Sequence, residues 1–225
     1  MRKYAIIVAG GTGTRMGANL PKQFMLLKGK PVLYYSIDAF LKAYEDMQVI
    51  LVVPEAYMSV GQEIVTGYFN KTKVQLTTGG LTRFQSVKNG LALVDEESVI
   101  FVHDAVRCLV SRELIRRCYE KALFAGSAIP VIVSKDSVRL MTDKGSEILD
   151  RNKVLLVQTP QTFLSKVILP AFKAADKVEF TDEASVVEAS GMRVSLVEGD
   201  ENNIKITRPI DLLIAEKILE GPMSP

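Results

Sequence analysis

The sequence has few of the residues that mark metal centres, disulfide frameworks and membrane spans. It contains no tryptophan, one histidine and two cysteines, Cys108 and Cys118, which form no CxxC pair. One histidine and no CxxC leave no His/Cys cluster for zinc, and two isolated thiols favour a reducing compartment. No apolar stretch is long enough to span a bilayer or to serve as a secretory signal. We therefore expect a cytoplasmic protein that has no membrane partner.

The sequence also lacks an excess of charge of either sign. There are 28 basic and 26 acidic side chains, so a broad basic surface for nucleic acid is not expected. Any important cations should instead be gathered locally around a small anion. With 225 residues and 48% hydrophobic residues, the chain can bury a substantial core.

Short apolar runs alternate with patterns of helical period along the chain. The runs predict buried strands at 5–8, 49–53, 74–77, 99–102 and 128–133. This β-α alternation predicts an α/β fold with a Rossmann-like, doubly wound, mostly parallel sheet covered by helices on both faces. We find no linker and expect one domain over residues 1–225. The last helix, from Pro209, is expected to bury Ile210, Leu213, Ile214 and Ile218.

Residues 134–158 break this alternation, because they show no helical period. Two short strand patterns at 138–141 and 155–157, with a turn at 142–145, predict a projecting β-hairpin arm. Two interpretations remain open from the residues alone. The arm is either a surface hairpin that covers a sheet edge or a device for dimerisation.

Three unusual polar or glycine-rich segments each follow a predicted strand. They are residues 10–22, 79–86 and 103–107. In an open parallel sheet the carboxyl ends of the strands lie along one edge, where ligands bind. We therefore expect these distant segments to converge on one crevice.

The first segment is a glycine-rich loop that begins at Gly10, Gly11 and Gly13 and contains Arg15 and Lys22. Backbone N–H groups of such a loop can cradle phosphate oxygens, and the two cations favour that interpretation over a tight turn with solvated charges. The glycine spacing matches neither the dinucleotide fingerprint nor the Walker A motif, which disfavours a NAD-dependent dehydrogenase.

The second segment places Gly79 and Gly80 before a helix start. It predicts either an anion or base pocket, or a plain helix entry with Thr82 as N-cap. In the third segment, Asp104 at a strand end suits Mg²⁺ or merely caps the next turn. The lone His103 is given no catalytic role, since such a residue is more often structural.

Two later stretches look ordinary when taken alone. Thr181, Asp182 and Glu183 resemble a cap and the first-turn acids of a helix. Lys205 reads as a surface lysine.

Taken together, the motifs resemble the 2-C-methyl-D-erythritol 4-phosphate cytidylyltransferases of the non-mevalonate isoprenoid pathway, a nucleotidyltransferase-type fold. The resemblance runs in order over nearly the whole chain. Its pieces are Ala9 to Met16, Pro21-Lys22-Gln23, Gly79-Gly80 with Arg83 and Ser86-Val87, His103-Asp104-Ala105 with Arg107, Asp150-Arg151, Thr159-Pro160-Gln161, Thr181 to Ser185, and Asn203-Ile204-Lys205 with Thr207 and Pro209.

The resemblance implies a role for each matching residue. CTP would be held by Ala9, Gly10, Gly11, Gly13, Gly79, Gly80, Arg83 and Ser86. Asp104 would ligate Mg²⁺ beside CTP. The catalytic residues would be Arg15, Lys22, Arg151 and Lys205, with Arg15 and Lys22 flanking the α-phosphate. The sugar-alcohol phosphate would be gripped by Arg107, Ser137, Arg151, Thr159, Thr181 and Lys205.

The resemblance also implies a homodimer, in which the arm crosses to the second subunit and Arg151 serves the neighbour's site. Two positions depart from the family pattern. Cys108 stands where proline is usual, and Ser137 stands where threonine is frequent, although the hydroxyl is kept. Neither change touches the cations. The alternatives are the same chemistry on ribitol 5-phosphate and a CTP-binding regulatory protein without catalysis.

Overall fold

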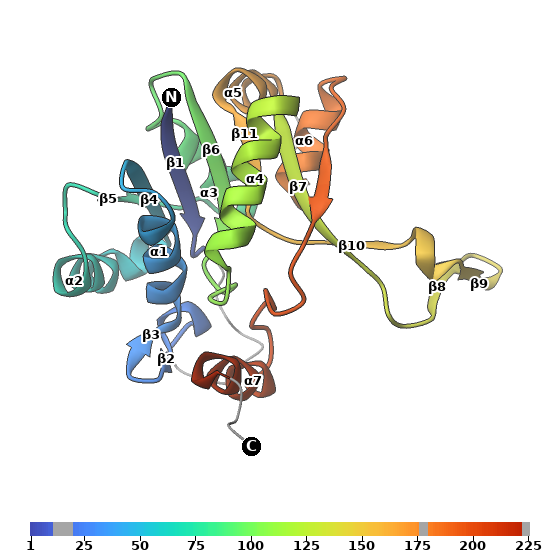
Figure 1. The fold of residues 1–225 in the computed structure, drawn as a ribbon, viewed down its shortest axis with the longest axis horizontal. Coiled ribbons are helices and arrows are strands. Elements are labelled where there is room, and N and C mark those ends of the chain that lie inside the picture. The colour runs from blue at the N-terminus through green and yellow to red at the C-terminus, as the bar shows by residue number, and fades with distance from the viewer. Residues whose placement is uncertain (11–19, 176–179, 222–225) are drawn as a thin grey trace.

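The computed structural model describes residues 1–10, 20–175 and 180–221, and its body is a mixed sheet between two layers of helices (Figure 1). The strand order is β10-β7-β11-β6-β1-β4-β5, and β12 pairs with β7 beside this path. The strands of this sheet are β1 (Arg2–Val8), β4 (Met47–Val53), β5 (Val74–Thr78), β6 (Ser98–Asp104), β7 (Ser127–Val133), β10 (Leu155–Val157), β11 (Gln161–Leu164) and β12 (Leu196–Glu198).

The strands β6, β1, β4 and β5 run parallel to one another, as the spacing of apolar runs predicts. In the register of β1, Val8 lies opposite Asp104 of β6 and Val52 of β4. The carboxyl ends of these strands therefore share one edge of the sheet. The α/β fold class expected from the sequence is confirmed.

The other half of the sheet contains a strand that the sequence did not predict. β11 is antiparallel to both of its neighbours, β6 and β7. Its four residues are all buried, but Gln161 and Thr162 interrupt the apolar run that would mark a buried strand. The preceding segment contains β10, which pairs antiparallel with the far end of β7.

The helices divide between the two faces according to the alternation of side chains along the strands. Ala5 and Ile7 of β1 pack in the cluster that contains α1, α2 and α4. Tyr4 and Ile6 pack in the cluster that contains α3, α5 and α6. The helices are α1 (Val32–Ala43), α2 (Met58–Tyr68), α3 (Arg83–Leu91), α4 (Arg112–Ala125), α5 (Ser165–Ala174), α6 (Glu183–Ala189) and α7 (Pro209–Glu220), with 3₁₀ turns η2 (Lys22–Phe24), η3 (Glu55–Tyr57) and η4 (Arg151–Lys153).

The last helix, α7, lies beyond the carboxyl edge of the sheet rather than on a face (Figure 1). It packs through Ala215 against a small cluster near the hairpin of β2 (Leu26–Leu27) and β3 (Lys30–Pro31). The expectation that α7 buries its apolar residues was wrong for Ile210, Leu213 and Ile214, which are exposed, and for Ile218, which is half-buried. The apolar pattern was real, but among the described residues α7 packs against the small cluster around Ala215 and not against a face of the main sheet.

The predicted arm is a two-stranded sheet of its own, formed by β8 (Val138–Thr142) and β9 (Gly145–Leu149). It projects away from the body next to β10 (Figure 1). The second strand pattern was assigned wrongly to the arm, because residues 155–157 form β10, which pairs with β7 of the main sheet. Within the described ranges, no helix has both the length and the apolar character that a membrane crossing requires.

The only histidine of the sequence fastens the segment that follows β6. His103 is fully buried, and its Nε2 lies 3.1 Å from the carbonyl oxygen of Arg107, to which it donates. The other ring nitrogen, Nδ1, therefore accepts from the hydroxyl of Thr159 at 3.0 Å. That hydroxyl oxygen in turn accepts from the backbone N–H of Asp104 at 3.1 Å. Burial lowers the pKa of His103 to about 4, so the ring is neutral at neutral pH.

Because His103 is buried and neutral, we expect the free energy of unfolding to fall at acid pH. Between pH 6.5 and about 4, the unfolded chain binds a proton at His103 and the folded chain does not. The free energy of unfolding therefore falls as the pH falls through this window, by about 2 kcal/mol at pH 5. Urea unfolding from pH 7 to pH 5 measures the effect. His103→Gln, which keeps a donor and an acceptor, should show a flatter dependence on pH, and parallel curves for the two proteins would contradict the assignment.

Candidate active site

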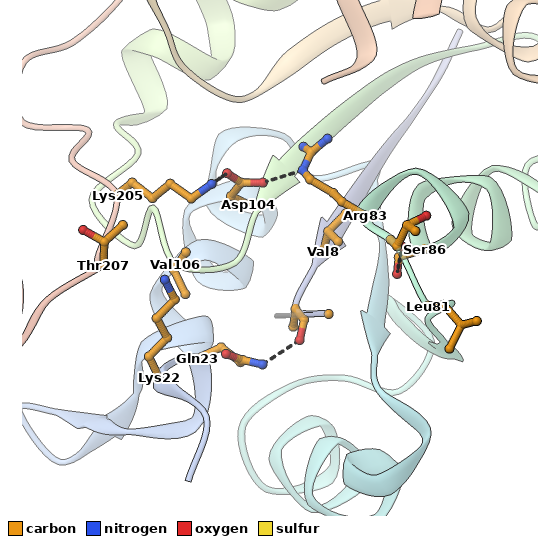
Figure 2. Close-up of a pocket in the computed structure, with 13 residues that line it drawn as sticks. Val8, Lys22, Gln23, Leu81, Arg83, Ser86, Asp104, Val106, Lys205 and Thr207 are labelled. Atoms are coloured by element: carbon orange, nitrogen blue, oxygen red, sulfur yellow. Dashed lines mark hydrogen bonds and ion pairs between the residues drawn. The ribbon is translucent and has the colours of Figure 1, made fainter. Parts of the chain in front are cut away.

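A cavity of about 630 Å³ opens at the carboxyl ends of β1 and β6, beside the start of α3 (Figure 2). All three polar segments that were expected to converge contribute to its wall. The lining residues are Val8, Ala9, Gly10, Lys22, Gln23, Leu81, Thr82, Arg83, Ser86, Asp104, Val106, Lys205 and Thr207.

The centre of this cavity is a carboxylate held between two cations. One oxygen of Asp104 lies 3.1 Å from Nε of Arg83, and the other lies 2.7 Å from Nζ of Lys205. Figure 2 shows the two cations reaching Asp104 from opposite sides. Burial alone would raise the pKa of Asp104, but the charges of Arg83 and Lys205 outweigh it and hold the pKa well below its usual range. The carboxylate is therefore ionised throughout the ordinary pH range.

Lys22 lines the same cavity from the segment that precedes β2, and its neighbour Gln23 anchors that segment. The amide nitrogen of Gln23 donates to the carbonyl oxygen of Ala9 at 2.7 Å. The structure thus brings Lys22 and the first residues of the glycine loop to the same wall. Gly11, Gly13 and Arg15 lie outside the described residues.

The segment before α3 needs glycine because Ser86 packs against it. The hydroxyl of Ser86 accepts the N–H of Gly80 at 3.1 Å and donates to the carbonyl of Thr82 at 2.9 Å. A Cβ atom at Gly79 would come within 2.9 Å of that hydroxyl oxygen, and one at Gly10 within 3.1 Å. The prediction that Thr82 caps α3 is confirmed, since its hydroxyl accepts the N–H of Gln85.

A mostly buried guanidinium without a carboxylate partner lies next to this centre. The two terminal nitrogens of Arg107 donate to the backbone carbonyls of Asn203, at 2.7 Å, and Val157, at 3.3 Å. Its Nε is buried without a hydrogen-bond partner, and no ion pair to Arg107 occurs among the described residues. A mostly buried cation whose hydrogen bonds go to backbone carbonyls suits an anionic ligand.

Four further residues expected to grip an acceptor lie in different environments. Thr159 is buried, and its hydroxyl proton is committed to His103. Thr181 is exposed, directly before Asp182, which caps α6 by accepting the N–H of Ser185. Ser137 and Arg151 are exposed on the arm segment and do not line the cavity of their own chain.

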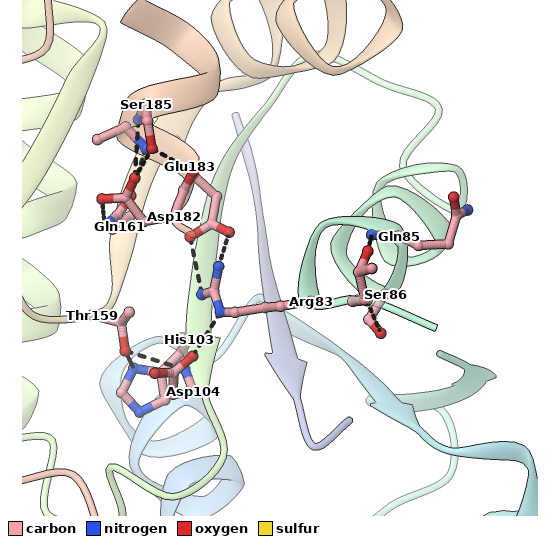
Figure 3. Close-up of polar contacts among 12 residues, drawn as sticks. Arg83, Gln85, Ser86, His103, Asp104, Thr159, Gln161, Asp182, Glu183 and Ser185 are labelled. Atoms are coloured by element: carbon pink, nitrogen blue, oxygen red, sulfur yellow. Dashed lines mark hydrogen bonds and ion pairs between the residues drawn. The ribbon is translucent and has the colours of Figure 1, made fainter. Parts of the chain in front are cut away.

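Sequence reasoning missed Glu183 and Asn203, which support the site from beneath. Glu183 is buried and binds the guanidinium of Arg83 with both carboxylate oxygens (Figure 3). Asn203 is buried, donates to the carbonyl of Thr159 at 2.8 Å, and accepts from Arg107. A signal for Glu183 was available, since it lies three and four residues before the buried Val186 and Val187, on the inward face of α6.

A metal site made by protein side chains alone is not evident. In the described part of the chain, no three His, Cys, Asp or Glu residues are grouped so as to hold a metal ion. Among the described residues that line the cavity, Asp104 is the one carboxylate.

The chain is similar to known proteins over nearly its whole length. The model of the family described as "IspD: 2-C-methyl-D-erythritol 4-phosphate cytidylyltransferase" matches residues 4–221. A protein of that name from Bacteroides fragilis is 47% identical over 219 residues, which cover 97% of this chain and all of the relative. One from Porphyromonas gingivalis is 40% identical, covering 97% of this chain and 98% of the relative.

Solved structures of similar proteins share the fold over nearly the whole chain. The 4-diphosphocytidyl-2C-methyl-D-erythritol synthase of Anaerococcus prevotii has a TM-score of 0.83 at 27% identity and covers 97% of this chain and 98% of its own. The 2-C-methyl-D-erythritol 4-phosphate cytidylyltransferase of Thermus thermophilus has a TM-score of 0.78 at 30% identity, with coverage of 98% and 100%. The chain therefore belongs to the 2-C-methyl-D-erythritol 4-phosphate cytidylyltransferase family.

Proposed function

We propose that this protein transfers the cytidylyl group of CTP to 2-C-methyl-D-erythritol 4-phosphate. The products are 4-diphosphocytidyl-2-C-methyl-D-erythritol and pyrophosphate. The observation that carries the proposal is the chain Arg83–Asp104–Lys205, which shares one cavity with Lys22 at the carboxyl edge of the sheet, in a member of this family.

The reaction is an in-line attack of the acceptor phosphate on the α-phosphorus of CTP. One phosphate oxygen forms the new P–O bond, and the bond to the β-phosphate breaks to release pyrophosphate. The nucleophile is already an anion, so no general base is needed. The state of His103 fits this scheme, because the ring is buried, neutral and committed to two hydrogen bonds. The residues have to bring two polyanions together and neutralise the charge that grows on the phosphoryl oxygens.

We assign the following roles on this basis. Arg15 and Lys22 flank the α-phosphate, and Lys205 holds the two reacting groups together. Ala9, Gly10, Gly11, Gly13, Gly79, Gly80, Arg83 and Ser86 form the CTP site. The glycine contacts around Ser86 support this assignment, because they leave the backbone bare beside the cavity.

Mg²⁺ is proposed to bind with CTP at Asp104. A single ionised carboxylate in a cavity suits Mg²⁺, which commonly uses one or two carboxylates together with phosphate oxygens. Both oxygens of Asp104 already contact cations, so the ion has to share the carboxylate with Lys205 or displace it. When bound, the ion supplies positive charge to the triphosphate.

The acceptor phosphate is assigned to Arg107, Thr159, Thr181 and Lys205, together with Ser137 and Arg151 of the arm. The unpartnered Nε of Arg107 supports this assignment. The hydroxyl of Thr159 keeps its proton and donates its hydrogen bond to Nδ1 of His103, so it does not donate to the acceptor phosphate in this arrangement.

The arm is proposed to complete the site of a second copy in a homodimer. An isolated two-stranded hairpin is marginally stable in water. This hairpin also exposes the apolar side chains of Leu140, Met141 and Ile148. Contact with a second copy would cover these side chains. We further propose a cytoplasmic location, supported by the two buried cysteines, which are not joined.

Pyrophosphate release with each nucleoside triphosphate crossed against each acceptor tests the function. We expect turnover with CTP and 2-C-methyl-D-erythritol 4-phosphate, and little with ATP, because the pocket around Gly79 and Ser86 is proposed to select cytosine over larger purines. Equal or faster turnover with ribitol 5-phosphate would move the assignment to that acceptor. Binding of CTP without pyrophosphate release under any condition would instead indicate a regulatory protein.

Mixing two defective variants tests the arm. Lys22→Ala should lose roughly 10²–10³ in turnover, and Arg151→Ala should raise the Michaelis constant for the acceptor. If Arg151 serves the partner's site, subunit exchange creates heterodimers that contain one complete site. Activity at low acceptor concentration should then recover to about a quarter of the wild-type value. No recovery in a mixture shown to exchange subunits would mean that Arg151 acts within its own chain.

A further inference from the structure

We propose that Glu183 is a positioning residue that sets the orientation of Arg83 and, through it, of Asp104. The inference deepens the proposed function and rests on it for the catalytic readout alone. Glu183 does not line the cavity and would not touch either substrate. Its influence passes through one guanidinium.

The burial of Glu183 calls for an explanation beyond helix capping. Its side chain is 1% exposed, whereas acids are rarely buried unless they are paired. The cap of α6 is already provided by Asp182. In the described part of the chain, the hydrogen-bond and ion-pair partner of Glu183 is Arg83, which lies 100 residues away on α3.

The pair is a poor device for stability alone. Removing two charges from water offsets most of their attraction, and apolar side chains of similar volume often stabilise a protein equally well. What the pair does provide is geometry. Both terminal nitrogens of Arg83 face the two oxygens of Glu183 in a bidentate contact, and the planar guanidinium is thereby fixed.

The fixed guanidinium presents its third nitrogen to the active site. Nε of Arg83 contacts one oxygen of Asp104 at 3.1 Å, and the other oxygen of Asp104 remains for Lys205 at 2.7 Å. Figure 3 shows Arg83 lying between the two carboxylates. Negative and positive groups thus alternate from Glu183 to Lys205, and the four formal charges sum to zero.

Loss of the Glu183 charge changes this division of contacts. Arg83 carries five N–H donors, of which three meet carboxylate oxygens in the structure. Without a carboxylate at position 183, the terminal nitrogens turn to Asp104, the remaining carboxylate beside them. Asp104 is then held by Arg83 through both oxygens, at the expense of Lys205.

The test compares the wild type with Glu183→Gln, Arg83→Gln and the double variant, in two measurements. The control is Glu188→Gln, which makes the same change of charge at an exposed side chain of the same helix. In ¹⁵N spectra of arginine side chains, the Nε–H of Arg83 should shift in Glu183→Gln and stay unchanged in Glu188→Gln. An unchanged Arg83 signal in folded Glu183→Gln would overturn the proposal, whatever the activity of the protein.

Kinetics provides the second measurement. Glu183→Gln should lower kcat by about 10–100-fold, the usual effect of an outer-shell partner, while the KM for CTP changes less than about threefold. In the Arg83→Gln background, Glu183→Gln should lower kcat no further, because its route of action is gone. Losses that multiply in the double variant, or a wild-type kcat in folded Glu183→Gln, would overturn the proposal.

Unequal folding of the variants does not block the comparison. Arg83→Gln leaves a buried carboxylate unpaired and is the variant most exposed to unfolding, whereas the double variant carries no unpaired charge. If Arg83→Gln does not fold, the spectra of Glu183→Gln and Glu188→Gln decide, and an unchanged Arg83 signal in Glu183→Gln overturns the proposal. If Glu183→Gln does not fold, the proposal predicts equal kcat values for Arg83→Gln and the double variant, and unequal values would overturn it. Absence of cytidylyl transfer in the wild type overturns the proposed function and leaves the spectroscopic test in force.

Discussion

The structure depends on one carboxylate, Asp104, held at the end of a buried strand between two cations. Arg83 and Lys205 reach it from segments that are far apart in the sequence. This arrangement keeps Asp104 ionised and keeps two long, flexible side chains in place before any ligand arrives. Preorganised charge of this kind is the largest contribution that many enzymes make to a reaction, because no reorganisation is needed in the transition state.

The sheet makes this arrangement possible. Parallel strands place their carboxyl ends on one edge, so that the loop after β1, the start of α3 and the end of β6 all meet the same cavity. Buried polar groups then hold the loops. His103 and Thr159 tie the segment after β6, Ser86 ties the turn before α3, and Glu183 fixes Arg83. Each of these side chains has its polar atoms satisfied within the protein, which makes the cavity wall rigid.

The parallel half of the fold was predictable from the sequence because each of its strands is a short apolar run between helical patterns. The convergence of three polar segments followed from that topology without knowledge of the family. β11 was not predictable, because Gln161 and Thr162 are buried polar residues, and the partners of Gln161 lie more than 20 residues away at the start of α6. The apolar face of α7 was recognised, but its exposure in a single chain was not.

The candidate site also contains residues that local sequence patterns reveal and residues that they do not. Gly79, Ser86 and Asp104 carry local signals, while Lys205 taken alone reads as a surface lysine, and its ion pair with Asp104 joins segments far apart in the sequence. Glu183 was overlooked because an acid in the first turn of a helix already has a sufficient local explanation. Contacts between residues 100 positions apart lie outside any local pattern.

Asp104→Asn tests most directly whether this balanced charge drives the reaction rather than the binding of CTP. The measurement pairs calorimetric CTP binding with the rate of pyrophosphate release at saturating substrates. We expect CTP binding to be retained, because Lys205 loses its counter-charge and can attract the triphosphate, while turnover falls by roughly 10²–10³. Turnover near the wild-type rate in a folded Asp104→Asn protein would contradict the account.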